Sequence, residues 1–559
     1  MQEQNYSHKG WSSFLNQLSR NTGLSIFLLF LCINLSFGQH AISDTEKLAS
    51  LAKLYGFLKY YHPEVAQGKF DWDQQVLDQI PKVLNASNKK DLSSIYLNWI
   101  EQLGLVEKCK KCKTKDSYFD KNFDLSWTQN PKLFTTELSS RLKYIENNRF
   151  QGEHFYASSD SFGRVIITNE PLYKDFEYPK EEYRLLGLFK YWNIIEYFYP
   201  YKYLTDQSWD SVLLEMLPKI RKAGSTEIYQ AAIKELVAKL DDSHAWIMFS
   251  NQKYKYLPFK ISHIENKAVV SGFYNDSLAK LTPLKLGDAI LEIDHTSVQE
   301  ELDKNFKYVA GSNKAAKTWR TYLDIFKTSE DQINLTVSTG GSIENYDLKT
   351  YNFDDFKISN NPSAIKSKSI SKDIGYMDLA YVEGVDVTPI FKSFTSKKAI
   401  IIDLRNYPRM IFSRFWRFLN SEKRNWVKEY VLDMDYPSRF VYKDINKTFK
   451  GSRTFKGKII LLVNEKTLSR AEFTALALQT ADNVITVGSQ TAGADGDVAI
   501  FEYLGGYKTA ITGVGVLYPN GSETQRVGIK IDIQVKPTIQ GLREGRDEIL
   551  DKAIEIANQ

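Results

Sequence analysis

An internal duplication in the first half of the chain constrains its fold more than any other feature. Residues from about 51 to 103 match residues from about 188 to 240 at a constant offset of 137. In both copies apolar and aromatic residues recur at spacings of three and four, the pattern of helices with a buried face. Two copies predict helical units that pack on each other or on a neighbouring domain, not a solenoid. Matching positions are Pro63 and Pro200, Trp72 and Trp209, Asp73 and Asp210, Pro81 and Pro218, and Lys82 and Lys219.

The amino-terminal residues have the features of an export signal. An apolar run, Leu24–Phe37, follows the basic residues Lys9 and Arg20 and ends at Gly38. Its length is typical of a signal peptide and short for a membrane span. We therefore expect residues 1–38 to be removed on export to the periplasm or the extracellular space. Retention as an amino-terminal membrane anchor is the alternative. No later run is apolar enough to cross a bilayer, so we expect no stable span after cleavage.

Cysteine usage agrees with an oxidising compartment. Cys109 and Cys112 are the cysteines that remain after the signal, in the sequence Cys-Lys-Lys-Cys. Two thiols are half of a zinc site, and no nearby pair of histidines completes it. We expect a local disulfide, which has a small effect on stability because it closes a very short loop. A redox-active pair is the alternative.

Short alternating strands follow the second copy, from about residue 255 to 353. Gly287-Asp288 forms a turn signal before a strand that carries Ile290 and Ile293. This segment resembles the part of PDZ domains in which "gly-asp-x-ile" enters a strand; a generic hairpin is the alternative. The resemblance implies that a peptide strand can be added to a sheet edge and that free C-termini of polypeptides are recognised there.

The last third of the chain alternates buried strands with helices. Residues 399–403 and 458–463 are apolar and strand-like, whereas 469–479 and 547–557 are helix-like. This order predicts an α/β core with a largely parallel sheet in a multidomain α+β chain. The expected segments are a signal peptide (1–38), a first helical repeat with a polar connector (39–180), a second helical repeat (181–254), a PDZ-like domain (255–353), a linker (354–372) and an α/β core (373–559).

Ser469 lies where a nucleophile is physically favourable. It follows a buried strand and opens an amphipathic helix, so the helix N–H groups and dipole can stabilise developing negative charge. A hydroxyl also needs a neighbouring base, and imidazole is the usual one. The alternative is that Ser469 is an N-cap, because Ser-x-x-Glu is also a capping box.

The chain resembles the tail-specific (carboxy-terminal processing) and tricorn-like serine peptidases over about residues 182–558. Those families carry Ser-x-x-Glu after a strand that ends in Val-Asn, and Val463-Asn464 precedes Ser469 here. The lysine that serves as general base in tail-specific enzymes falls on Ala494, which cannot accept a proton. The tricorn-like branch uses a histidine directly after a serine, and Ser243-His244 matches that pair.

The resemblance implies a role for each residue of the site. His244 is the general base, Ser243 orients the imidazole, and Glu523 supports Ser243; a solvated hairpin glutamate is the alternative for Glu523. The backbone N–H groups of Arg470 and Arg409 form the oxyanion hole. Arg409 and the residue after it replace two glycines of the family pattern.

These residues predict an exported serine endopeptidase that hydrolyses polypeptides through a Ser-His acyl-enzyme, with no metal or organic cofactor. The net charge of +5 is spread without a long basic run, so nucleic-acid binding is not expected. A catalytically inactive peptide-binding protein of the same fold is the alternative, because the family lysine and both glycines are absent.

Overall fold

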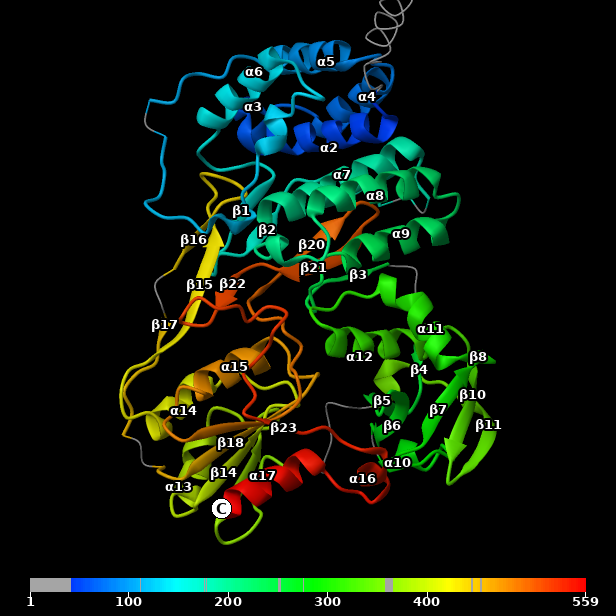
Figure 1. The fold of residues 1–559 in the computed structure, drawn as a ribbon, viewed down its shortest axis with the longest axis vertical. Coiled ribbons are helices and arrows are strands. Elements are labelled where there is room, and N and C mark those ends of the chain that lie inside the picture. The colour runs from blue at the N-terminus through cyan, green and yellow to red at the C-terminus, as the bar shows by residue number, and fades with distance from the viewer. Residues whose placement is uncertain are drawn as a thin grey trace, which may run out of the picture.

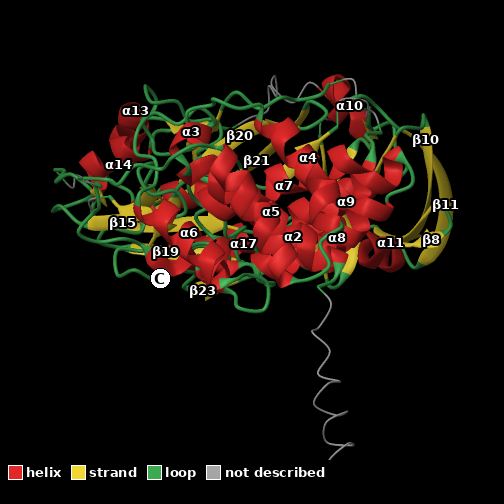
Figure 2. Ribbon diagram, turned by 90° about the horizontal axis from the view of Figure 1, so that it is seen from above, coloured by secondary structure: helices red, strands yellow, loops and turns green. Residues whose placement is uncertain are grey.

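The computed structural model describes residues 42–559 except 111, 175, 177, 250–252, 275, 357–364, 444–445 and 453–454. The expected signal peptide, 1–38, therefore lies outside the described residues. The duplicated helices lie at one end of the molecule, and two lobes of mixed helix and sheet lie at the other (Figure 1). Seen from above, the helices cover the middle, with β10 and β11 at one side and α13 and α14 at the opposite side (Figure 2). No helix in the described part of the chain is both long and apolar enough to span a bilayer.

The duplication is confirmed as two sets of helices in the same register. Each helix of the second copy begins 137 residues after its counterpart, at a position that its own N-cap or first turn favours. The pairs are α2 (Asp44–Tyr61) with α7 (Glu181–Phe198), α4 (Trp72–Leu84) with α8 (Trp209–Lys222), and α5 (Lys89–Gln102) with α9 (Thr226–Ala238).

The two copies are related by a local pseudo-two-fold axis. Gly56 of α2 and Asn193 of α7 are equivalent positions, and they touch: a Cβ on Gly56 would lie 1.8 Å from the Asn193 Oδ1. Asn193 Nδ2 donates to the carbonyls of Ala52 and Phe189, which are also equivalent to each other, at 2.8 Å each. The axis therefore passes close to Asn193, and only a residue without a side chain fits opposite it.

Two ion pairs repeat this symmetry. Lys53 of the first copy bonds Asp210 of the second at 2.6 Å, and Lys190 of the second copy bonds Asp73 of the first at 2.6 Å. Lys53 and Lys190 are equivalent positions, as are Asp73 and Asp210. The contact thus has the reciprocal form of a symmetric dimer interface, built inside one chain.

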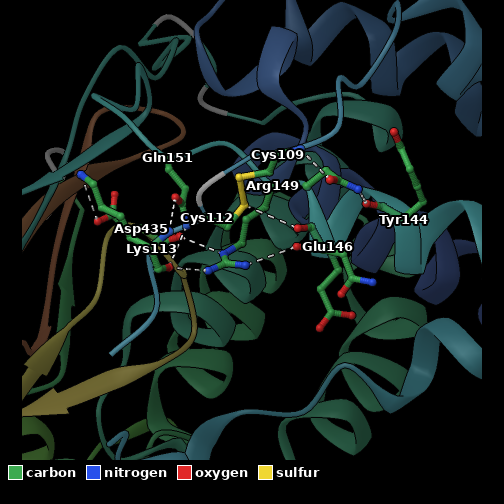
Figure 3. The surroundings of a disulfide bond; sticks show 10 residues. Cys109, Cys112, Lys113, Tyr144, Glu146, Arg149, Gln151 and Asp435 are labelled. Carbon is green, nitrogen blue, oxygen red and sulfur yellow. Dashed lines mark hydrogen bonds and ion pairs between the residues drawn. A yellow bond between two sulfur atoms is a disulfide. The ribbon is translucent and has the colours of Figure 1, made fainter. Parts of the chain in front are cut away.

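The connector between the copies packs against the last third of the chain. It contains α6 (Thr136–Asn147), β1 (Ala157–Ser159) and β2 (Val165–Ile167). Cys109 and Cys112 form a disulfide in the loop after α5, and the Cys109 N–H donates to Asn148 at 2.8 Å (Figure 3). Nearby, Arg149 Nε donates to the carbonyl of Asp435 at 2.8 Å. The disulfide loop and the turn that contains Asp435 therefore share one contact region.

The PDZ-like lobe contains a sheet in the order β11-β10-β7-β6-β5, with β8 paired to β7. The predicted turn is present: Gly287 has φ 82° and leads into β7, where Ile290 is buried. Helix α12 lies beside β5, the strand at the sheet edge. The bounds are β5 (Phe259–Ile264), β6 (Lys267–Phe273), β7 (Ala289–Ile293), β8 (Thr296–Ser297), α11 (Val298–Asn305), α12 (Lys314–Ile325), β10 (Gln332–Thr339) and β11 (Ser342–Lys349).

Residues 367–559, called the catalytic lobe below after the role expected of them, form the expected α/β core. Its sheet has the order β12-β13-β14-β18-β19-β23, parallel from β13 to β23. Alternate residues of each strand face opposite layers, so α13–α15 cover one face and α17 the other. The bounds are β12 (Ser367–Ser369), β13 (Ile374–Asp378), α13 (Val387–Phe394), β14 (Ala399–Asp403), α14 (Phe412–Leu419), β18 (Lys458–Val463), α15 (Arg470–Leu478), β19 (Val484–Gly488), β23 (Ile533–Gln534) and α17 (Glu548–Asn558). The segment expected as a linker, 354–372, thus contributes Ser367–Ser369 to the sheet as β12.

Smaller sheets join the helical repeats to the catalytic lobe. β3 (Trp246–Met248), directly after the second copy, pairs with β21 (Tyr507–Thr512), which pairs with β20 (Val498–Tyr503). β15 (Asn425–Leu432) pairs with β16 (Phe440–Tyr442) and with β22 (Gly515–Leu517). The β3–β21 pairing brings the end of the second repeat to the catalytic lobe.

Candidate active site

Ser469 has a strained backbone at the carboxyl end of β18. Its φ of 57° and ψ of −120° lie in a region that residues with a side chain seldom occupy. Its N–H donates to the carbonyl of Ala494 at 2.9 Å, and α15 begins at the next residue. Strain of this kind persists only where neighbouring structure enforces it, and it concentrates at functional sites.

Glu472 holds the Ser469 backbone in this strained conformation. Its buried carboxylate accepts hydrogen bonds from the N–H groups of Ser469 at 3.3 Å, Gly493 at 2.8 Å and Ala494 at 3.0 Å, and from the Thr491 hydroxyl. Burial raises the pKa of Glu472 to about 7, although these donors oppose the rise. The Ser-x-x-Glu pattern therefore does more than cap a helix, because the glutamate joins the Ser469 backbone to residues 491–494.

His244 is buried in the turn between α9 and β3. Its Nδ1 lies 2.8 Å from Thr512 Oγ1, and that hydroxyl donates its own proton to Asp242 Oδ2 at 2.8 Å. Because the hydroxyl has only one proton, this network assigns the imidazole proton to Nδ1. Nε2 then carries a lone pair, and it is buried without a hydrogen-bond partner among the described residues.

Asp242 organises this base and was not anticipated from the sequence. Its fully buried carboxylate also accepts from the backbone N–H groups of His244 and Thr512 at 2.9 Å each and from Gln525 at 3.3 Å. Burial lowers the pKa of His244, and the negative charge of Asp242 partly offsets that effect. Asp242 lies two residues before His244, which was the only signal; nothing in the sequence pointed to Thr512.

Ser243 has a different role from the one expected. Its Oγ donates to the carbonyl of Ala492 at 3.1 Å and accepts from the N–H of Ser312 at 2.8 Å. The hydroxyl proton is therefore used away from the imidazole, and Thr512 orients His244 instead. Ser243 joins residues 491–494 to the start of α12 in the PDZ-like lobe.

Glu523 does not support Ser243 in this structure. Its Oε1 bonds Lys121 Nζ at 2.8 Å, and its Oε2 accepts from the Tyr203 hydroxyl at 2.7 Å. Both partners belong to the amino-terminal half of the chain, so Glu523 ties that half to the catalytic lobe. The expected contact with Ser243 is wrong, because the single Ser243 hydroxyl proton is donated to the carbonyl of Ala492.

The two expected oxyanion donors differ in availability. The Arg409 N–H donates to the carbonyl of Leu379 at 3.4 Å, so this long bond must open before it can bind an oxyanion. Arg470 is the first residue of α15, where N–H groups lack acceptors within the helix. Its guanidinium lies 5.3 Å from the ring of Tyr407, in the segment that carries Arg409.

Residues 492–496 contact Ser469 as well as the residues that surround His244. Ala494 contacts Ser469 on one side, and Ala492 contacts Ser243 on the other. A Cβ on Gly496 would lie 3.1 Å from the Thr512 side chain. Because Nε2 is unpartnered, Ser469 and His244 are not hydrogen-bonded to each other, and proton transfer requires their approach. Catalytic bonds are often long in ligand-free enzymes.

The comparisons with known proteins identify two domains in the chain. Residues 373–535 match the model of peptidase family S41, and residues 253–337 match a PDZ domain. Residues 373–535 are therefore a peptidase family S41 domain, and the chain is a serine peptidase. No curated protein sequence matches it. Within the described part of this serine peptidase, no group of three or more His, Cys, Asp or Glu side chains is arranged to hold a metal ion.

Solved structures match this chain at low sequence identity. Mature CPAF in complex with lactacystin is 15% identical, and the match covers 67% of this chain and 98% of that chain with a TM-score of 0.55. The photosystem II D1 C-terminal processing protease is 16% identical over 64% of this chain and 97% of that chain, with a TM-score of 0.41. The CPAF match supports the common architecture.

Proposed function

We propose that this serine peptidase is an exported endopeptidase in which Ser469 attacks the peptide carbonyl and His244 carries the proton. The observation that carries the proposal is the chain of hydrogen bonds from His244 through Thr512 to Asp242. It fixes the imidazole as the tautomer whose Nε2 accepts a proton, and it places a buried carboxylate where the imidazolium will form. This arrangement corresponds to a catalytic triad in which the Thr512 hydroxyl lies between the base, His244, and the acid, Asp242.

The steps follow from this arrangement. The Ser469 Oγ forms a bond to the carbonyl carbon while its proton passes to His244 Nε2. The Arg470 N–H and the dipole of α15 stabilise the oxyanion. The carbon–nitrogen bond then breaks, the imidazolium proton goes to the leaving amine, and an ester remains on Ser469. Water gives a proton to His244 and attacks the ester carbon. The bond between that carbon and Ser469 Oγ then breaks, His244 returns the proton to Oγ, and the acid leaves.

Substrate recognition is proposed at the PDZ domain. Strand β5 ends the sheet order, so its outer edge can pair with an extended peptide, which is the usual PDZ mode of binding. The substrates are therefore polypeptides, and free C-termini are the natural ligands of such an edge.

Export is supported by two features of different kinds. The amino-terminal sequence has the pattern of a signal peptide, and Cys109 and Cys112 are bonded as expected in an oxidising compartment. Cell fractionation with amino-terminal sequencing tests this point. A mature protein that begins near Gln39 in the periplasm or medium agrees with it, and an intact chain in the membrane fraction indicates an anchor.

A fluorophosphonate probe tests the nucleophile, because it reacts with activated serines. The parent protein should be labelled, and Ser469→Ala should not. Ser452→Ala is the matched control: Ser452 is exposed, and among the described residues its hydroxyl bonds only the Arg417 carbonyl, so its loss should leave labelling intact. Labelling that persists in Ser469→Ala rejects the assignment. A folded, unlabelled parent indicates an inactive peptide-binding protein.

A further inference from the structure

The side chain of Arg470 has no role in the acylation and deacylation steps, which use only its backbone N–H. Its guanidinium lies 5.3 Å from the ring of Tyr407, in the segment that follows β14. β14 and β18 are parallel neighbours, so that segment and Ser469 leave the sheet at the same edge. The guanidinium therefore lies at the edge of the sheet that carries the nucleophile.

This guanidinium has no anionic partner in the described part of the chain. Its Nε–H is buried there without a hydrogen-bond acceptor. Arginine stays protonated at physiological pH, so loss of a proton cannot remove the charge. A buried donor that lacks an acceptor is unfavourable, and a ligand that supplies a carboxylate removes this cost. The Arg470 side chain is therefore suited to binding an anion.

The ring of Tyr407 is a cover that a ligand can displace. It lies over the guanidinium and attracts it through a cation–π contact, yet Tyr407 itself is 53% exposed. A carboxylate is a stronger partner for a guanidinium than an aromatic face, and it can accept from Nε–H and one Nη–H together. Displacement of this ring opens a bidentate anion site next to Ser469.

The carboxylates at the same edge of the sheet are engaged elsewhere. Asp403, the last residue of β14, pairs with Arg405 at 2.6 Å. Asp378, the last residue of β13, accepts a hydrogen bond from Asn406 Nδ2 at 2.8 Å. In the described part of the chain, neither carboxylate lies within ion-pair distance of Arg470. The positive charge at this position is thus left for a ligand.

Further arginines make this side of the active site positive. Residues 404–421 contain four arginines and no acidic residue. One of them, Arg409, pairs with Glu383 at 3.3 Å, but both side chains are more than half exposed, so the pair is weak. Another, Arg414, is exposed on α14, which packs beside α15 (Figure 1). Their summed potential attracts negatively charged segments toward Arg470.

We propose that Arg470 determines specificity by binding the side-chain carboxylate of an aspartate or glutamate near the scissile bond of the substrate. The Cα atoms of Arg470 and Ser469 are about 3.8 Å apart, and an extended peptide advances about 3.3 Å per residue. The acidic residue therefore lies within about three residues of the cut. The inference rests on the proposed peptidase function, because it names the class of substrate that the same site takes.

Cleavage by the full chain tests this selection. Mass spectrometry of a tryptic peptide library after digestion shows at which position aspartate and glutamate are enriched. Two internally quenched peptides are then made from the most frequently cut sequence, with glutamate or glutamine at that position and an amidated C-terminus. The glutamate peptide should have a kcat/KM at least about tenfold higher, the usual effect of a charge-assisted hydrogen bond. Equal values for the two peptides overturn the proposal.

Substitutions identify the residue that selects, and the ratio of the two rates is compared within each variant. Arg470→Met should reduce the ratio to less than about twofold, and Arg470→Lys should keep part of it. Arg470→Glu should instead favour a peptide with lysine at that position, a reversal that a packing role would not produce. Arg417→Met is the matched control, because Arg417 is exposed on α14, and its ratio should equal that of the parent.

Thermal unfolding checks that each variant is folded, and Arg470→Gln replaces Arg470→Met if the methionine variant is not. A preference for glutamate that survives loss of the guanidinium overturns the proposal.

Binding to the full chain with Ser469→Ala separates this inference from the peptidase function. The probes are fluorescein-labelled, amidated decapeptides of serine, alanine and leucine with one central glutamate or glutamine. Fluorescence anisotropy should show tighter binding of the glutamate peptide by about tenfold, and adding Arg470→Met should remove the difference. A glutamine peptide with a free C-terminus that binds tighter than the glutamate amide would assign Arg470 to terminal carboxylates and overturn the proposal.

The two failures are distinguishable. If the fluorophosphonate probe does not label the protein while the preference that depends on Arg470 remains, the peptidase function fails and the anion site stands. If the probe labels Ser469 and both quenched peptides are cut equally, the peptidase function stands and the role of Arg470 is rejected.

Discussion

His244 Nδ1 and Thr512 Oγ1 lie 2.8 Å apart although 268 residues separate them in the chain. His244 lies just before β3 at the end of the second helical repeat, and Thr512 is the last residue of β21 in the catalytic lobe. Pairing of these strands holds the two side chains together, and Asp242 completes the contact. The base is thus assembled from two lobes, so its geometry depends on how the repeat docks.

Removal of the Thr512 hydroxyl should impair catalysis without unfolding the protein. In Thr512→Val the imidazole loses the acceptor for its Nδ1 proton and its link to Asp242. We expect kcat/KM to fall about 10²-fold, the usual contribution of a positioned general base. Thr512→Ser keeps the hydroxyl and should recover most of the activity. Equal losses in both variants would mean that Thr512 only packs.

The contrast between predicted and observed features has a physical basis. The repeats, the PDZ domain and the parallel core follow from local periodicity and turn chemistry, which the sequence displays directly. Thr512 was missed because strand pairing between distant segments leaves no local signal. Glu523 and Ser243 were assigned by position in a family pattern, which transfers residues but not their hydrogen bonds. Lys121 and Tyr203 engage Glu523, and neither could be placed near it from sequence.

Substitutions of Ser469 should abolish activity, and their effect on stability should depend on whether the new residue has a Cβ. Ser469→Ala and Ser469→Gly should both abolish turnover. Glycine relieves the strain of φ 57° but alanine does not, because the cost comes from the Cβ. Glycine also raises the entropy of the unfolded chain, which offsets part of this gain. The net result should be that Ser469→Gly is about 1 kcal/mol more stable than Ser469→Ala. Denaturant unfolding measures the difference; a less stable glycine variant would mean that the backbone at Ser469 is relaxed.

The pseudo-symmetric ion pairs provide a matched test of burial. Lys190 and Asp73 are 5% and 3% exposed, whereas the Asp210 side chain that pairs with Lys53 is 54% exposed. Lys190→Met leaves buried carboxylates without this cation and should destabilise the protein by about 3–5 kcal/mol. Lys53→Met, at the equivalent position, should cost about 1 kcal/mol or less. Chemical denaturation compares the two, and equal effects would reject burial as the deciding factor.

The pH dependence of kcat/KM should identify His244 as the base. An imidazolium cannot accept the Ser469 proton, so the rate should rise with pH as the ring deprotonates. Burial lowers the pKa of His244, which places this acidic limb below the ordinary imidazole value of about 6.5. Asp242→Asn removes the charge that opposes the shift, so it should reduce the rate and move the limb to still lower pH. Glu472 has a pKa raised to about 7, so a limb near that value would indicate this carboxyl instead. A limb near pH 7 that Glu472→Gln moves and Asp242→Asn does not would therefore contradict the assignment of His244.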